Sequence, residues 1–251
     1  MGEVKEELKA AREDVLPLFV ERYEADSRNG VRLLVEQAKR RLGKLEEERA
    51  RIERLKIYEK KYADRGYICG IDEAGRGPLA GPVVAGAVIL PQECDMLYIN
   101  DSKKLSPQKR EELYKEIMEK AIAVGVGIIG PQRIDEINIL QATYEAMREA
   151  IRKLEVLPDI LLNDAVTIPE VTIPQVPIIK GDAKSISIGA ASIVAKVTRD
   201  RLMVDYDKVM PEYGFASHKG YGAKRHIEAI KKYGPSPIHR ETFIRNFILK
   251  D

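Results

Sequence analysis

The chain has 251 residues, of which 44% are apolar and 33% charged, and a formal net charge of +2. This length allows one large domain, or one domain with an appendage, and the composition is typical of a soluble globular protein. No apolar run approaches the roughly 20 residues that a membrane helix needs, and the charged N-terminus does not resemble a signal peptide. Because only two cysteines are present, we expect reduced thiols, a cytoplasmic location and no membrane partner.

Residues 1–64 are expected to form a helical N-terminal extension. They are rich in Glu, Lys and Arg, hold few β-branched residues, and are interrupted at residues 24–30 (EADSRNG). After the interruption, apolar residues recur at spacings of four, three and seven, as on one face of an amphipathic helix: these are Ala38, Leu42, Leu45 and Ile52. Two interpretations stay open, namely a helical hairpin that packs on the body of the protein, or a segment that holds substrate or a partner.

Residues 65–251 alternate short apolar runs with amphipathic segments. The apolar runs predict five strands, over residues 67–71, 83–90, 121–128, 159–163 and 176–179. Helices are predicted to begin after Ser106-Pro107, after Pro131 and after Ser185, because Ser and Pro favour helix starts. This order of elements predicts an α/β domain with a mixed sheet flanked by helices, followed by a helical C-terminal region.

Four acidic residues follow predicted strands: Asp72, Glu73, Asp164 and Asp182. Open α/β sheets bind ligands beyond the carboxyl ends of their strands, so these acids are expected to meet at one edge of the sheet. Carboxylates without a Cys or His ligand suit Mg²⁺ or Mn²⁺ better than zinc. Adjacent strand residues point to opposite faces, so the first two acids can share a site only if their strand ends there.

Two other interpretations compete with a metal site. A single Asp after a strand is more often a helix cap or turn residue, and with the basic C-terminal run SHKGYGAKRHIEAIKKYG this leaves room for a non-catalytic nucleic-acid-binding module. That module does not explain four acids at strand ends. A P-loop nucleoside triphosphatase is excluded, because the chain has no G-x-x-x-x-G-K-[ST] motif.

Several sequence blocks carry a family resemblance: GIDEAGRGPLAGPVVAGAVIL, NDSKKLS, LLNDAV, KGDAKSISIGAASIVAKVTRDRLM and HKGYGAKRH. They resemble the signature blocks of bacterial ribonuclease HII, in that family's order. Two departures are Asn163, where an apolar residue is common, and the N-terminal extension, which exceeds the minimal family core. The resemblance implies a ribonuclease H-like fold and endonucleolytic cleavage of the RNA strand of RNA–DNA hybrids. It also implies cleavage at single ribonucleotides embedded in duplex DNA, leaving 5′-phosphate and 3′-hydroxyl ends.

The same resemblance implies roles for individual residues. Asp72, Glu73, Asp164 and Asp182 would form the catalytic set and hold two divalent metal ions, Mn²⁺ or Mg²⁺, with the substrate. The turn Gly75, Arg76 and Gly77 would contact the 2′-hydroxyl and an adjacent phosphate, Lys103 a backbone phosphate, and Tyr221 the sugar on the DNA side of a junction. Lys196 and Arg199 are expected to organise structure. We expect a monomer, and a replication or repair factor is a candidate partner.

Overall fold

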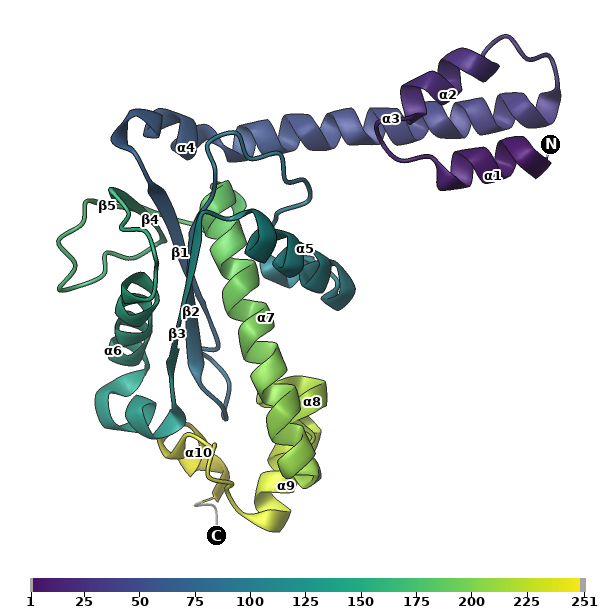
Figure 1. Ribbon diagram of the computed structural model, residues 1–251. Helices are drawn as coiled ribbons and strands as arrows, with labels where there is room; N and C mark the ends of the chain where they lie inside the picture. The colour runs from purple at the N-terminus through teal and green to yellow at the C-terminus, as the bar shows by residue number, and fades with distance from the viewer. Residues whose placement is uncertain (1, 249–251) are drawn as a thin grey trace. The chain divides into compact units, whose positions relative to one another are not determined.

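The computed structural model describes residues 2–248 (Figure 1). The chain divides into two compact units, one ending at Arg54 and the other beginning at Leu55. Within the described residues, no helix is long and apolar enough to cross a membrane. Cys69 and Cys94 are both free and buried.

The first unit consists of helices α1 (Gly2–Ala10) and α2 (Leu16–Tyr23) and most of the long helix α3 (Asn29–Leu55). The predicted interruption at residues 24–30 is confirmed, because α3 begins only at Asn29. The predicted hairpin is wrong in helix number, since the segment before the interruption folds as two helices, with Pro17 in the first turn of the second. The core of this unit is drawn from all three helices and comprises Val4, Leu8, Leu16, Phe19, Val31, Val35 and Ala38.

The second unit is built on a five-stranded mixed sheet in the order β3-β2-β1-β4-β5. The strands are β1 (Ile68–Ala74), β2 (Val83–Ile89), β3 (Ala123–Ile129), β4 (Ile160–Asp164) and β5 (Gln175–Ile178). Strand β2 is antiparallel to β1 and β3, whereas β4 pairs in parallel with β1 on one side and with β5 on the other. All five predicted strands and the mixed sheet are therefore confirmed.

Helices α7 (Ile186–Val209) and α6 (Pro131–Arg152) cover opposite faces of the sheet (Figure 1). Both helices lie unusually close to the strands because glycines face them. A Cβ atom on Gly70 would come within 2.1 Å of the backbone of α7, and one on Gly127 within 1.9 Å of the backbone of α6. The absence of a side chain at these positions is what allows the close approach.

Other helices complete the unit: α4 (Ile57–Lys61), α5 (Pro107–Lys120), α8 (Phe215–His218), α9 (Lys224–Tyr233) and α10 (Glu241–Ile248). Short 3₁₀ turns join them: η1 (Ala63–Arg65), η2 (Ser102–Lys104), η3 (Gly181–Ala183) and η4 (Pro211–Tyr213). The three predicted helix starts are confirmed. Ser106 and Ser185 each cap a helix by accepting a backbone N–H, and Pro131 occupies the first turn of α6.

Candidate active site

The first strand does not end where the sequence predicted. Antiparallel pairing with β2 continues through Ala74, with Asp72 opposite Gly86 and Glu73 opposite Ala85, and this pairing keeps both acids on the strand. The expected end of the strand at these acids is therefore wrong, although the charges of the two carboxyl groups still interact. Parallel pairing with β4, however, stops at Ile71. The two acids thus occupy the part of β1 that extends past its pairing with β4, whose own last residue is Asp164.

Asp72 is buried, and its environment favours the protonated carboxyl. Burial raises the pKa of Asp72 well above its usual range, and the charges of Glu73 and Asp164 raise it further. Hydrogen bonds from the Ser192 side chain and from the backbone N–H of Glu73, at 2.7 Å, act in the opposite direction on that pKa. A carboxyl group with a pKa perturbed by burial and by neighbouring charges is a candidate member of a functional site.

Glu73 and Asp182 belong to the same electrostatic cluster. Burial raises the pKa of Glu73, Arg76 lowers it through an ion pair at 3.3 Å, and Asp164 raises it. Burial also raises the pKa of Asp182, and the charges of Asp101 and Asp164 add to this effect. The four acids singled out in the sequence therefore interact at one end of the sheet, with Asp164 influencing the other three.

Asp164 is linked to Asp182 through the backbone as well as by charge. The N–H of Gly181, the first residue of η3, donates to Oδ1 of Asp164 at 2.7 Å. This bond joins the end of β4 to the turn that carries Asp182. The two acids are 18 residues apart in the sequence, so only the folded chain brings them together.

Sequence reasoning missed Asp101, which lies next to the predicted residue Lys103. Asp101 caps η2 by accepting the N–H of Lys103 at 2.9 Å, and its charge reaches Asp182. The charge of Lys103 lowers the pKa values of Glu73 and Asp182, which burial raises. The acid in the block NDSKKLS was the available signal, but it follows no predicted strand.

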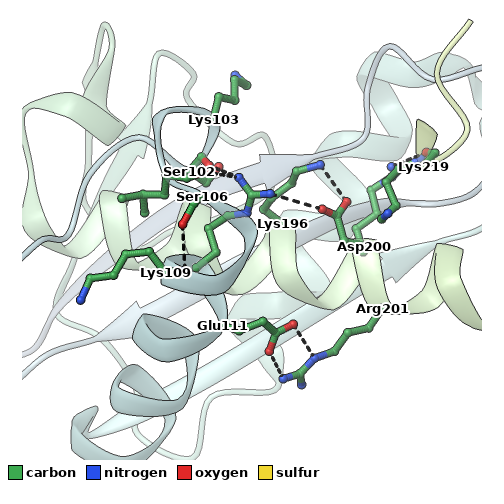
Figure 2. A network of polar contacts seen from close by, with 12 residues as sticks. Ser102, Lys103, Ser106, Lys109, Glu111, Lys196, Asp200, Arg201 and Lys219 are labelled. Carbon is green, nitrogen blue, oxygen red and sulfur yellow. Dashed lines mark hydrogen bonds and ion pairs between the residues drawn. The ribbon is translucent and has the colours of Figure 1, made fainter. Parts of the chain in front are cut away.

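A polar network anchors η2, the turn that carries Lys103 (Figure 2). Arg110 donates to the carbonyl oxygen of Ser102 at 2.7 Å and lies 3.9 Å from the carboxylate of Asp200. The hydroxyls of Ser102 and Ser192 are 3.0 Å apart, and Ser192 in turn bonds Asp72. The side chain of Lys103 points away from this network, whereas its backbone is held by it.

A buried arginine, Arg240, holds the backbone of the Gly-Arg-Gly turn. Gly75 has a φ of +94°, which favours glycine, whereas Gly77 has no positive φ. Arg240, fully buried, donates to the carbonyl oxygens of Gly75 at 2.6 Å and Arg76 at 2.9 Å. Burial and then the charge of Arg199 lower the pKa of Arg240 to about 9.

Arg199 performs a similar task on α7, which confirms its predicted structural role. Its guanidinium is fully buried and donates to the carbonyl oxygens of Pro82, Ala80 and Lys219. These bonds join the loop after the Gly-Arg-Gly turn to the segment that carries Tyr221. Arg240 was missed because a single Arg gives no sequence signal for burial.

Tyr221 lies in the segment between helices α8 and α9. Its side chain is 43% exposed, and its ring lies 5.9 Å from both Lys196 Nζ and Arg199 Cζ. The backbone oxygen of Tyr221 is bonded to Nδ1 of the buried His226 at 2.8 Å. Its backbone is thereby held in place while one side of the ring stays accessible.

Asn163, the departure noted in the sequence, has a structural explanation. The side chain is fully buried, and its Nδ2 donates to Oε1 of Gln175 at 2.8 Å. Gln175 also bonds the backbone N–H and carbonyl of Ile168. The pair holds the loop that follows Asp164, although the side-chain oxygen of Asn163 is buried without a hydrogen-bond partner among the described residues.

The donor set suits a hard divalent cation, because Asp72, Glu73, Asp164 and Asp182 offer oxygen ligands only. Among residues 2–248, no three His, Cys, Asp or Glu side chains already form a group arranged to hold a metal ion. Burial is the main cause of the raised pKa values of Asp72, Glu73 and Asp182, and the charge of Asp164 raises all three further.

Comparison with known proteins gives consistent matches. The family model described as Ribonuclease HII matches residues 69–246, and the one described as Ribonuclease HII N-terminal domain matches residues 1–63. A protein of Lachnoclostridium phytofermentans named Ribonuclease HII is 64% identical over 246 residues, which cover 98% of this chain and 97% of that protein.

Solved structures resemble the second unit. The crystal structure of ribonuclease H2 from Pyrococcus horikoshii OT3 has a TM-score of 0.62 at 30% identity, over 72% of this chain and 97% of that one. A structure of the PCNA:RNase HII complex from Archaeoglobus fulgidus has a TM-score of 0.60 at 29% identity, over 73% and 98% of the two chains. These likenesses confirm the ribonuclease H-like fold that the sequence predicted.

Proposed function

The chain belongs to the ribonuclease HII family and is a ribonuclease H, and on this premise we propose that it hydrolyses the RNA strand of RNA–DNA hybrids. We propose that it also cleaves at single ribonucleotides embedded in duplex DNA, by two-metal-ion catalysis that leaves 5′-phosphate and 3′-hydroxyl ends. In this proposal residues 65–251 form the catalytic domain and residues 1–64 a helical extension.

The observation that carries the proposal is the grouping of the acids at one end of the sheet, where β1 extends past its pairing with β4 and Gly181 of the Asp182 turn bonds Asp164. Burial, reinforced by neighbouring carboxylates, raises the pKa values of Asp72 and Asp182, and burial with the charge of Asp164 raises that of Glu73 despite Arg76. Such a cluster is costly to a protein that has no cation to bind there. A structural role as helix caps would not require the acids to interact.

Each proposed residue has a distinct task. Asp72, Glu73, Asp164 and Asp182 would hold Mg²⁺ or Mn²⁺, and these ions supply a deprotonated water and neutralise charge on the phosphate when bound. Asp72 accepts the backbone N–H of Glu73, which fixes its carboxylate before any ion arrives. Arg76 pairs with Glu73 at 3.3 Å and is exposed enough to turn toward a phosphate.

Recognition of the ribose would fall to the Gly-Arg-Gly turn. Arg240 donates to the carbonyl oxygens of Gly75 and Arg76, and we propose that the N–H groups of the turn meet the 2′-hydroxyl. Lys103 is exposed and would contact a backbone phosphate. Tyr221 would stack on the sugar at the DNA side of a junction.

The proposals for a partner and a location draw on a solved relative and on the free cysteines. The related archaeal protein whose structure was solved with PCNA supports a replication factor as a partner of this chain too. We propose a monomer in the cytoplasm, where the two free cysteines would stay reduced.

One assay tests the function directly. A duplex with one embedded ribonucleotide, and a uniform RNA–DNA hybrid, are each incubated with the protein in Mg²⁺, in Mn²⁺ or in EDTA. We expect cleavage of both substrates with either ion and none in EDTA. Binding of both substrates without cleavage under any condition would instead favour a non-catalytic nucleic-acid-binding module.

A further inference from the structure

Glu59 reaches from helix α4 to the first turn of α7. Its Oε1 accepts the hydroxyl of Ser185 at 2.5 Å and the backbone N–H of Ser187 at 3.0 Å. Both serines are buried, and Ser185 is the residue that caps α7. One carboxylate oxygen thus holds two donors at the start of the 24-residue helix that covers the sheet.

The same turn of α7 continues directly into the turn that carries Asp182. The N–H of Ser185 donates to the carbonyl oxygen of Gly181 at 2.8 Å, and the N–H of Gly181 donates to Asp164 at 2.7 Å. A continuous chain of hydrogen bonds therefore runs from Glu59 through Ser185 and Gly181 to Asp164. Asp182 lies inside this chain, between its two fixed points.

Helix α4 is itself seated on the body of the second unit. Tyr58 and Tyr62 flank Glu59 and pack against an apolar cluster that includes Ile188 of α7. The other members of the cluster are Ile68, Ile160, Leu162 and Ile178. The apolar packing of the two tyrosines is enough to seat α4 on this cluster. It does not account for the acidic side chain of Glu59.

The carboxylate of Glu59 is also not fully paired by hydrogen bonds. Oε2 of Glu59 is buried and has no hydrogen-bond partner among the described residues. Leaving such an oxygen unpaired is costly, whereas an anion at a helix N-terminus is favourable. The arrangement accepts one unpaired oxygen while Oε1 fixes the start of α7.

We propose that Glu59 is a positioning residue for Asp182, and that it raises the affinity of the acid cluster for divalent metal. The inference rests on the proposed function, since it takes Asp182 as a metal ligand. It assigns a role to residues upstream of the catalytic core: Glu59 lies in the segment matched by the N-terminal family model, yet it acts on the catalytic site.

The test compares full-length variants by Mn²⁺ titration in a calorimeter without substrate. Loss of a residue that hydrogen-bonds a metal ligand typically lowers metal affinity about 10–100-fold. Glu59 contacts the turn that carries the ligand rather than the ligand itself, so Glu59→Ala should weaken Mn²⁺ binding about tenfold. Glu59→Gln keeps an oxygen acceptor at the same place and should stay within about threefold of wild type. Asp64→Asn, at an exposed acid nearby, is the matched control and should leave the affinity unchanged.

A double-mutant cycle separates positioning from general stability. In an Asp182→Asn background, Glu59→Ala should cause no further loss of Mn²⁺ affinity, because the ligand it positions is already absent. If Glu59→Ala does not fold, Glu59→Asp, which withdraws the carboxylate by one methylene, should show the same direction of change. Cleavage by Glu59→Ala should approach the wild-type kcat at saturating Mn²⁺.

Unchanged Mn²⁺ affinity in a folded Glu59→Ala or Glu59→Asp protein would overturn the inference, as would an equal loss in the Asp182→Asn background. Failure of the proposed function looks different. In that case the wild-type protein itself would show no metal-dependent cleavage, whatever the variants bind.

Discussion

The guanidinium of Arg240 donates to the carbonyl oxygen of Gly75 at 2.6 Å, across 165 residues of sequence. Further bonds reach the carbonyls of Arg76 and Gly81, so one fully buried cation ties the Gly-Arg-Gly turn to the segment that follows it. The carbonyl dipoles stabilise the positive charge of the guanidinium, whose planar fork of N–H donors reaches several carbonyl oxygens at once. The shape of the proposed ribose-recognition turn thus depends on the C-terminal region.

Replacing Arg240 tests this dependence. Arg240→Ala leaves the carbonyls of Gly75, Arg76 and Gly81 without their donor, so we expect a loss of roughly 2–3 kcal/mol in the free energy of unfolding, measured by urea denaturation. Arg240→Lys restores charge but cannot reach all three carbonyls, and it should raise KM on a single-ribonucleotide substrate. A lysine variant with wild-type stability and wild-type KM would contradict the role.

Asp72→Asn should separate chemistry from folding. The substitution keeps an acceptor for the N–H of Glu73 but removes a metal-binding charge. The rate of cleavage should therefore fall far more than tenfold, which corresponds to a loss of several kcal/mol of transition-state stabilisation. Because burial and the charge of Glu73 raise the pKa of Asp72, the variant should melt no lower than wild type in EDTA. Only wild type should gain thermal stability on addition of Mn²⁺. Near-normal activity at saturating Mg²⁺ would refute the assignment.

Tyr221 should matter most at a junction between RNA and DNA. Tyr221→Ala removes a partly exposed ring while the backbone contact to His226 is retained, and base or sugar stacking is worth roughly 1–3 kcal/mol. The loss in kcat/KM should be larger on a single embedded ribonucleotide than on a uniform hybrid, with Tyr221→Phe as the control. An equal loss on both substrates would mean that the ring only packs.

The buried histidines predict how stability depends on pH. Burial lowers the pKa values of His226 and His239 to about 4, from about 6.5, and their Nε2 atoms lie 2.9 Å apart. As pH falls from about 6.5 to 4, the unfolded chain takes up protons that the folded chain does not. Stability should therefore decrease by up to about 1.4 kcal/mol per pH unit for each histidine.

Acidic groups oppose this trend, so a variant is needed to isolate it. The raised pKa of Asp72 stabilises the folded state on acidification, because the folded carboxyl binds its proton first. His226→Gln should give a flatter slope of unfolding free energy against pH in EDTA. An identical slope in wild type and variant would show that the histidine does not titrate on unfolding.

Truncation distinguishes the two parts of the N-terminal extension. A chain that begins at Leu55 keeps Glu59 and the acids, so its kcat should stay within a few-fold of wild type. If Lys39, Arg40 and Arg41 bind phosphates of the substrate, their removal should raise KM and lower the salt slope of binding by about 0.9 for each phosphate. A chain that begins at Arg65 should in addition need more metal, because it lacks Glu59.

Thermal midpoints of the two truncated chains decide between the two interpretations of residues 1–64. A large drop in midpoint with an unchanged salt slope would identify the segment as a structural brace. A small drop with a shallower slope would identify it as a substrate-binding segment.

The sequence by itself determined the elements and the chemical type of the site. Alternating apolar runs and Ser or Pro at helix starts predicted five strands and three helices, because periodicity and capping are local properties. The sequence also indicated four acids at strand ends, since an acid directly after an apolar run is visible without a structure. Its blocks resembled one family, and the comparisons confirmed that family.

Only the tertiary structure decided which groups act on those acids. Continued pairing with β2 extends β1 through Ala74, whereas the apolar run that predicted this strand ends before Asp72. The burial of Arg240 and the link from Glu59 to α7 join residues more than 120 positions apart. Burial and through-space charge depend on packing between distant segments, and a single sequence carries no local signal for them.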